Sequence, residues 1–465
     1  MVFSSLIFLF AYLAVTLVLY YVVPFKARNA VLFAVSLVFY GWGEPKYIVV
    51  MLFSILVAYI FGFFVGKYRE SAPKKARTYL IVSVILNLCA LLFFKYANFF
   101  IENLALIPGL GGLEPIEGLK LPVGISFYTF QIMSYTIDVY RGDARVQRRI
   151  VPFGTYVTLF PQLIAGPIVR YTDINRELKE RQINLPQIQD GIKLFILGLG
   201  SKVLIANNVG ALWTEIEAIG AGEGFLSIST PLAWMAVFAY SLQIYFDFSG
   251  YSLMAIGLGK MLGFEFPKNF DFPYISRSFT EFWRRWHMTL GSWFREYLYI
   301  PLGGNRVSRP RLYFNLFVVW AATGFWHGAS WNFIFWGLFF FVFLVIERMG
   351  FKQVLERHSA FSHVYVIFFL LLSWALFAVT DLGMLGDLFT RMFVPVGGVD
   401  WIYYLRNYIV VFILGTVLST PALKGLYLRL EKNNVFCLIF FGAIFLASTA
   451  YLVDATYNPF LYFRF

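Results

Sequence analysis

Charged residues are scarce in this chain of 465 residues, of which only 14% are Asp, Glu, Lys or Arg. Soluble proteins contain roughly 25%. There are only two cysteines. This number excludes a disulfide scaffold, and because both lie inside apolar runs we expect small core residues. Hydrophobic residues make up 59% of the chain and aromatic residues 20%. A soluble globule of this composition would expose apolar patches that aggregate, so we predict an integral membrane protein.

Motifs of several enzyme classes are also missing. The chain has no Gly-x-Ser-x-Gly elbow, no phosphate-binding loop of the Gly-x-x-x-x-Gly-Lys-Ser/Thr type and no His-Glu-x-x-His helix. Hydrolase, ATPase and zinc-protease functions therefore have no local support. No set of carboxylate or cysteine ligands accompanies His287 and His327, so we predict that no metal is bound.

Long apolar runs follow one another along the whole chain. They predict an all-α, polytopic membrane protein with about eleven or twelve spans, at roughly 20 residues each. The run at 312–346 is too long for one span and predicts a hairpin of two shorter helices. The runs lie near 2–23, 29–42, 46–66, 78–95, 122–140, 188–212, 231–258, 312–346, 361–380, 403–420 and 435–453.

The net charge of +12 follows the cytoplasmic bias of Lys and Arg in membrane proteins and does not indicate a nucleic-acid partner. Basic residues cluster at 67–77 and acidic residues at 102–117, so the first loop is predicted inside and the second outside. If successive loops continue to alternate between inside and outside, both termini lie outside. The segment 151–169 must then enter and leave the membrane on the same side. Pro161 and Pro167 suit such a broken, re-entrant segment, which is tolerated where it is buried in protein or lines a cavity.

One extended polar region, 260–311, interrupts the spans and mixes arginines with tryptophans. We expect amphipathic or partly buried helices at the cytoplasmic interface, where both residue types are favoured. Arg284, Arg285 and Arg295 are candidates to attract an anionic acyl donor. The alternative is that these arginines only follow the positive-inside bias and that the helices only anchor the protein.

Only four histidines occur in the chain. His358 and His363 flank a basic loop and are expected to be structural or solvated. His287 lies in the arginine-rich region, and His327 lies between apolar stretches. A buried histidine stays neutral and can accept a proton, as a general base must, but a hydrogen-bonded core histidine is the alternative. The glycines flanking His327, at positions 324 and 328, would let other backbone or a substrate approach closely.

Two acids, Asp138 and Asp247, lie inside apolar runs. An ionisable residue at membrane depth commonly marks a proton or ion path. Tyrosines and a serine nearby supply hydrogen-bond donors, so we favour a structural or site-shaping role for both acids.

Several ordered strings resemble the membrane-bound O-acyltransferase family, and the resemblance covers essentially the whole chain. It is closest to the bacterial branch that contains the alginate O-acetylation membrane protein, with the D-alanyl transfer protein of teichoic acid synthesis as a more distant relative. The strings are Pro122–Gln131, Phe160–Pro167, Phe246–Ser252, Asn269–Pro273, Phe282–Leu290 with Trp293–Arg306, and Gly324–Trp331.

The resemblance implies a single domain over residues 1–465, with transmembrane helices and re-entrant or interfacial helices around a tunnel. It implies His327 as the catalytic histidine and His287 as the second family histidine. Further candidates for the donor site or tunnel are Trp286, Asp247, Trp326 and Asn332. The chain departs from the family at Leu253, where many relatives carry an acid, and at Ala378, where they carry an arginine, so alginate itself is not assigned.

The function implied is transfer of acetyl or another small acyl group from a cytoplasmic thioester, acetyl-coenzyme A or acyl carrier protein, to a cell-envelope or exported polysaccharide. The thioester is a substrate, and no bound cofactor is expected. Membrane lipid, a separate extracytoplasmic esterase-like acyltransferase and the polysaccharide are the expected partners, at the bacterial cytoplasmic (inner) membrane. Alternatives are D-alanyl or other acyl transfer to teichoic acid, and a non-catalytic transporter or scaffold of a polysaccharide-modifying complex.

Overall fold

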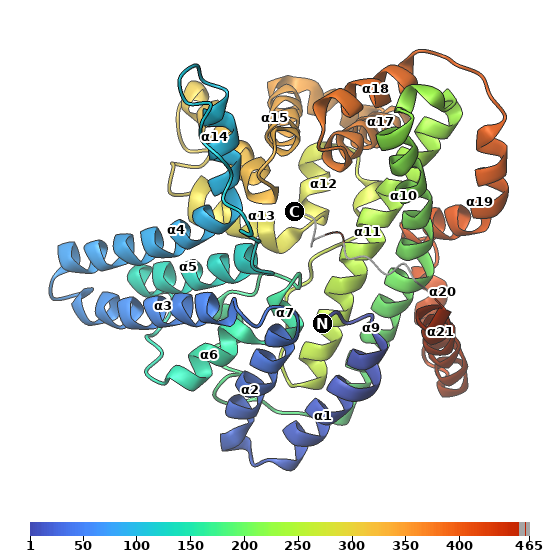
Figure 1. The fold of residues 1–465 in the computed structure, drawn as a ribbon. Coiled ribbons are helices and arrows are strands. Elements are labelled where there is room, and N and C mark those ends of the chain that lie inside the picture. The colour runs from blue at the N-terminus through green and yellow to red at the C-terminus, as the bar shows by residue number, and fades with distance from the viewer. Residues whose placement is uncertain (455–460, 462–465) are drawn as a thin grey trace. The chain divides into compact units, whose positions relative to one another are not determined.

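The computed structural model describes residues 1–454 and 461, and every regular element in these residues is helical, which confirms the predicted all-α class. Figure 1 shows these helices along the chain. The chain divides into two compact units. Unit 1 comprises Met1–Phe195 and Met254–Pro267, and unit 2 comprises Ile196–Leu253 and Lys268–Phe465. Two long helices, α9 (Leu185–Gly200) and α11 (Thr230–Met261), contribute residues to both units.

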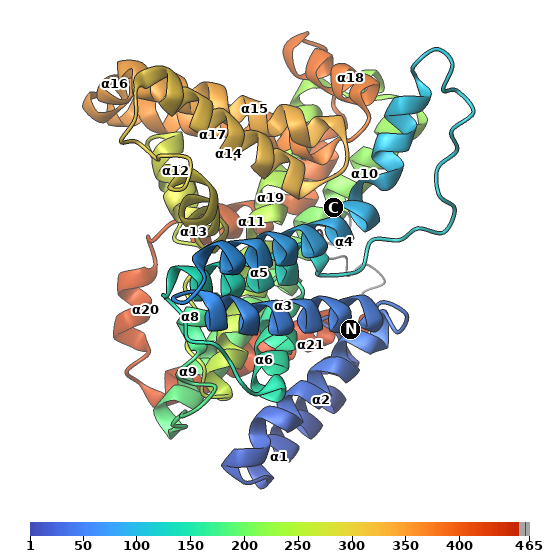
Figure 2. The same cartoon turned by 90° about the vertical axis from the view of Figure 1, so that its left-hand side faces the viewer.

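Unit 1 is built around three neighbouring helices, α3, α4 and α5 (Figure 2). Apart from the parts of α9 and α11, its helices are η1 (Phe8–Tyr12), α1 (Leu13–Val22), α2 (Phe25–Gly43), α3 (Ile48–Tyr68), α4 (Pro73–Ala105), α5 (Ile125–Arg141), α6 (Ile150–Thr158), α7 (Phe160–Leu163) and α8 (Tyr171–Ile174).

The segment predicted to be broken is broken in the structure. Helix α6 ends at Thr158, α7 covers only one turn, and the chain then runs without regular structure to α8. Every residue from 153 to 169 is buried. The break and the burial in protein are therefore confirmed, while entry and exit on one side of the membrane stays a prediction.

Unit 2 contains the helices that follow α9, including those of the arginine-rich region. Besides parts of α9 and α11 they are η2 (Ser201–Ala206), α10 (Asn207–Gly222), η3 (Phe225–Ser227), η4 (Pro273–Ile275), α12 (Phe279–Arg285), α13 (Met288–Phe294), η5 (Arg295–Tyr299), α14 (Arg309–His327), α15 (Trp331–Ile346), η6 (Glu347–Phe351), α16 (Lys352–Arg357), α17 (Ser359–Ala378), α18 (Leu382–Phe393), α19 (Asp400–Leu418), α20 (Lys424–Leu430) and α21 (Asn434–Asp454).

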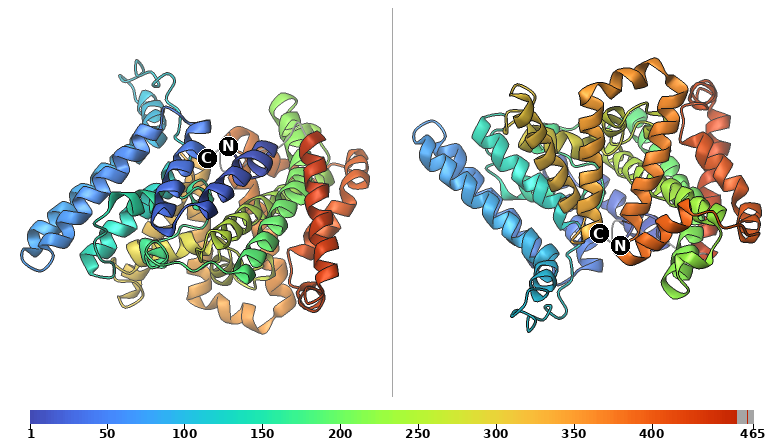
Figure 3. Two further views of the ribbon diagram at one scale, coloured as in Figure 1. Left: turned by 90° about the horizontal axis from the view of Figure 1, so that it is seen from below. Right: turned by 90° about the horizontal axis from the view of Figure 1, so that it is seen from above.

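The run at 312–346 forms two helices, as predicted, which pair as α14 and α15, with α17 packed beside α15 (Figure 3, right, gold and orange). The two helices of the pair touch through backbone at Gly324 and Gly337. A Cβ on Gly324 would overlap the carbonyl oxygen of Phe333, and one on Gly337 would overlap the carbonyl oxygen of Trp320. The close approach expected at Gly324 is therefore made by the protein's own backbone.

Gly337→Ala is expected to destabilise the α14–α15 pair by about 1–3 kcal/mol, because a methyl group must push backbone apart in a packed interface. The same shift would move His327, the last residue of α14. Thermal unfolding in detergent measures the effect. Gly442→Ala is the matched control, since a Cβ there meets nothing within 4 Å; an equal loss of stability in both variants would contradict the packing argument.

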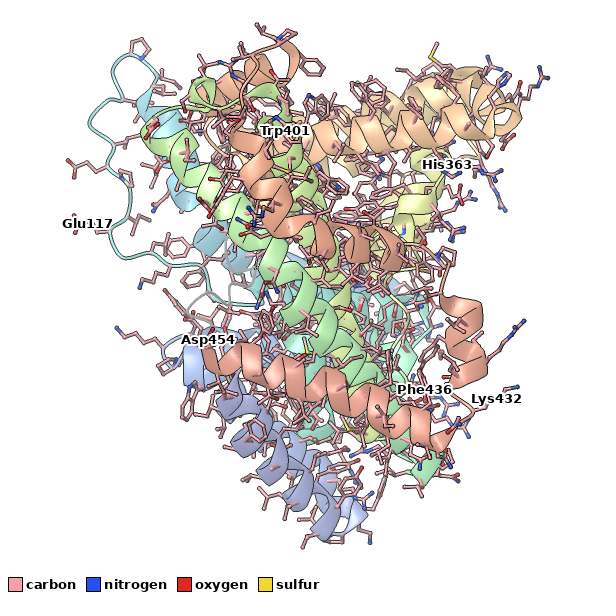
Figure 4. The ribbon with its side chains drawn as sticks, turned by 90° about the vertical axis from the view of Figure 1, so that its right-hand side faces the viewer. Glu117, His363, Trp401, Lys432, Phe436 and Asp454 are labelled. Atoms are coloured by element: carbon pink, nitrogen blue, oxygen red, sulfur yellow. The ribbon has the colours of Figure 1, made fainter. Side chains whose placement is uncertain are left out.

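Seven described helices are long and apolar enough to span a membrane. They include α19 and α21, which bury little of their surface. Phe436 lies near the start of α21 and Asp454 at its end (Figure 4). Leu438 on this helix is 77% exposed, which suits contact with lipid.

The prediction that Cys89 is a core residue is wrong, because its side chain is exposed on α4. An apolar run in a membrane protein has a lipid-facing side as well as a core side.

Candidate functional site

His327 lies in a narrow cavity of unit 2, with a volume of about 10 Å³. This is the room that one water molecule needs. Four helices, α11, α14, α15 and α17, form its walls together with two residues outside them, Trp286 and Leu461. His327 is the last residue of α14. The lining residues are Ile244, Asp247, Phe248, Trp286, His327, Trp336, Trp374, Phe377 and Leu461.

Aromatic rings enclose the imidazole of His327, which is buried. The ring centroids of Trp326, Trp336 and Phe377 lie 5.0, 4.9 and 5.3 Å from that of His327, each in an edge-on arrangement. The helix ends here because the following Gly328 is extended, with φ −168°. Such apolar surroundings disfavour the imidazolium form, so His327 has the environment of a neutral base.

A buried ion pair forms another wall of the cavity. Asp247 on α11 lies 2.6 Å from the Nζ atom of Lys202 on η2, and both side chains are almost fully buried. The second oxygen of Asp247 accepts a hydrogen bond of 3.0 Å from the backbone N–H of Leu461. Lys202 was missed by the sequence analysis, although a lysine inside the apolar run 188–212 is the kind of signal that marks such a site.

His287 lies near the cavity but is not among its lining residues. It connects α12 to α13, and its Nδ1 atom is 3.2 Å from the Oδ1 atom of Asn269. Its ring packs edge-on against Phe248, at 4.6 Å between centroids, and lies 6.1 Å from Trp326. Burial lowers the pKa of His287 to about 3, so it is neutral at physiological pH. The ring of Trp326 is thus a neighbour of both histidines.

Helix α12 connects this cavity to a larger, polar basin of about 480 Å³. Ser278 caps the helix by accepting a hydrogen bond from the N–H of Glu281. The carboxylate of Glu347 accepts two more from Phe279 and Thr280. At the other end of α12, Trp286 lines the cavity. The basin is lined by Asp271, Arg277, Ser278, Thr280, Glu281, Arg284, Arg285, Lys352, Leu355 and Glu356.

The arginines of the basin differ in their partners. Arg285 bonds Glu281 at 3.0 Å and lies 3.6 Å from Asp271. A hydrogen bond from Lys268 holds the pKa of Asp271 below its usual value. Within the part of the chain that the structure describes, the Arg284 side chain has no carboxylate partner, nor does that of Arg277. The basin therefore presents two guanidinium groups to an anion.

Comparison with known proteins identifies the family. The sequence profile of the membrane-bound O-acyltransferase family matches residues 143–375. The probable alginate O-acetylase AlgI of Azotobacter vinelandii is 40% identical over 84% of this chain and 78% of its own length. The peptidoglycan O-acetyltransferase of Helicobacter pylori is 35% identical over 82% of this chain and 78% of its own length. The chain belongs to the membrane-bound O-acyltransferase family. It is a multi-pass membrane protein and an O-acyltransferase, which confirms the predicted enzyme class.

The predicted distant relation is also found: the teichoic acid D-alanyltransferase of Streptococcus thermophilus is 29% identical over 54% of this chain and 63% of its own length.

The other predicted site residues of this O-acyltransferase lie in different places. Asn332 donates hydrogen bonds to the carbonyl oxygens of Leu376 and Phe377, and so joins the start of α15 to the end of α17. Arg295 is exposed on η5, outside the basin lining. Asp138 is buried on α5 in unit 1.

The two histidines expected to be structural or solvated also lie outside the cavity. His358 is exposed, and His363 is half-buried near the start of α17 (Figure 4).

Proposed function

We propose that this O-acyltransferase moves acetyl groups from a cytoplasmic thioester towards a polysaccharide of the cell envelope or an exported polysaccharide. The observation that carries the proposal is His327, a buried histidine enclosed by aromatic rings at the end of α14 and lining an internal cavity. The names of the relatives, an alginate O-acetylase and a peptidoglycan O-acetyltransferase, support the acetyl group and the class of acceptor.

In the proposed reaction His327 accepts the proton of an acceptor hydroxyl as that oxygen attacks the thioester carbonyl. A C–O bond forms and the C–S bond breaks. The leaving thiolate takes up the proton from the imidazolium, so the histidine returns to its neutral form. The aromatic walls leave room for about one water molecule, which limits the competition of water with the acceptor for the acyl group.

The polar basin is the proposed entry point of the donor. Arg277 and Arg284 would hold the phosphates of coenzyme A or the acidic surface of a carrier protein. Arg285 belongs to the same basin, and α12 leads from it to Trp286 and the cavity. Arg295 lies outside the basin and would contribute only long-range electrostatic attraction of the anionic donor.

Arg284→Glu is expected to raise the KM for the donor roughly tenfold or more with kcat little changed, since a charge-assisted hydrogen bond contributes about 1.5–3 kcal/mol. Initial rates in purified membranes, with acetyl-coenzyme A in one series and acetylated carrier protein in another, test this and separate the two donors. Lys432→Glu makes the same change of charge at an exposed position (Figure 4). Equal KM values in both variants, with each donor, would remove the basin from the donor site.

The proposal extends to the surroundings of the enzyme. Residues 1–465 act as one family domain in the bacterial cytoplasmic membrane, with both termini outside. A separate extracytoplasmic esterase-like transferase receives the acyl group and completes the modification. The apolar exposed faces of α19 and α21 support contact with membrane lipid.

The function is tested by alkali-released acyl ester in exported glycans. Cells that lack this chain are expected to lose acetate ester, and the unaltered chain is expected to restore it. Released D-alanine in place of acetate would favour the teichoic acid alternative. Ester that is unchanged by the deletion would overturn the proposal.

A further inference from the structure

We propose that Asn269 is a positioning residue that fixes His287 as the tautomer protonated on Nδ1, so that His287 presents a hydrogen-bond acceptor, Nε2, to its surroundings. This inference deepens the proposed function. It rests on that function only where it gives His287 a role in acyl transfer. Asn269 was noted in the sequence only as part of a family string, without a role. It lies in the segment of the chain that joins α11 to η4, and it is buried.

The Oδ1 atom of Asn269 is the centre of the arrangement. It accepts a hydrogen bond of 3.2 Å from the backbone N–H of Thr289 and one of 2.9 Å from the hydroxyl of Thr289. The Nδ1 atom of His287 lies 3.2 Å from the same oxygen. The amide nitrogen of Asn269 donates to the hydroxyl of Ser252 on α11, at 3.0 Å.

The direction of these bonds follows from chemistry alone. A backbone N–H can only donate, so the atom of Asn269 that faces Thr289 must be the oxygen and not the amide nitrogen. A carbonyl oxygen can only accept, so the His287 Nδ1 atom must carry the proton of the bond they share. In a neutral imidazole the lone pair is then on Nε2.

Asn269 also fixes the backbone of His287. His287 has φ 44°, in the left-handed region, which is strained for a non-glycine residue and persists only where the surroundings impose it. The N–H of Met288 donates to the main-chain oxygen of Asn269 at 2.9 Å. Asn269 thus holds both the ring and the strained backbone, and sets their orientation together.

The consequence concerns what His287 can bind. Protonated on Nδ1, the ring accepts a hydrogen bond at Nε2, which suits an O–H or N–H group such as an acceptor hydroxyl or an amide of the donor. The opposite tautomer would donate from Nε2 and would suit a thioester carbonyl. Phe248, which packs on His287, also lines the cavity of His327, so the orientation of the ring bears directly on that site.

Nitrogen-15 NMR of histidine-labelled protein in detergent or lipid tests the proposal. The chain has only four histidines, so His287→Gln identifies the resonances of His287 by their loss. In the unaltered protein we expect a protonated Nδ1 and an unprotonated Nε2. A protonated Nε2 in the unaltered protein would overturn the proposal, whether or not any variant folds.

Two substitutions test Asn269 itself. Asn269→Asp keeps an acceptor for His287 and Thr289, and should keep Nδ1 protonated. Asn269→Leu has similar size but no acceptor, and should lose that preference. Retention of the Nδ1–H form in Asn269→Leu would show that another group sets the tautomer. Because the spectrum does not depend on turnover, a missing acyl-transfer activity would count against the proposed function and leave this inference standing.

Discussion

His327→Ala is expected to reduce acyl ester formation by roughly 10²- to 10⁴-fold, the usual contribution of a general base. The reason is geometric as well as chemical: His327 lines the internal cavity, whereas His287 does not, so His327 is the histidine that we propose as the general base. Alanine removes the base and leaves Trp336 and Phe377 in place around it. Alkali-released ester from cells complemented at matched membrane levels gives the size of the loss.

His358→Ala is the control for the same change of residue type, because His358 is exposed and does not line the cavity. It should restore ester as well as the unaltered chain. If His327→Ala also restored full ester, the general base would lie elsewhere, and the chain would be a scaffold for another enzyme. If the His327→Ala protein accumulated normally and formed almost no ester, the scaffold function would be excluded.

Lys202→Met is expected to destabilise the folded protein by about 3–5 kcal/mol, because it leaves the buried carboxylate of Asp247 without its cation. Methionine fills a similar volume, so the loss measures the charge and not a cavity. The midpoint of thermal unfolding in detergent should fall by many degrees. Ester formation should fall as well, since Asp247 is part of the cavity wall.

Two comparisons make this result specific. The double variant Lys202→Met with Asp247→Asn should recover much of the stability, since a neutral amide can still accept the N–H of Leu461. Lys268→Met breaks a pair of the same 2.6 Å length, with Asp271, whose side chains are 58% and 39% exposed. Lys268→Met should lower the free energy of unfolding by less than about 1 kcal/mol, because exposed ion pairs contribute little to stability. Equal losses from the buried and the exposed pair would refute the role of burial.

Much of the fold could be predicted from local sequence. Apolar runs gave the helices, the excess length at 312–346 gave the α14–α15 pair, and Pro161 with Pro167 gave the break between α6 and α8. These features depend on residues close together in the chain, where helix length and proline geometry decide. Cys89 shows the limit: an apolar run does not reveal which side faces the protein core and which faces lipid.

The sequence by itself determined the all-helical membrane class, the family and the two histidines, because composition and ordered motifs are local properties. Only the tertiary structure decided that His327 lines the cavity while His287 is held by Asn269, and that Asp247 is paired with Lys202. These partners are 18 and 45 positions apart in the chain. A hydrogen bond or ion pair depends on distances of about 3 Å, and such distances are set by the packing of α11, η2, α12 and α14, not by spacing along the sequence.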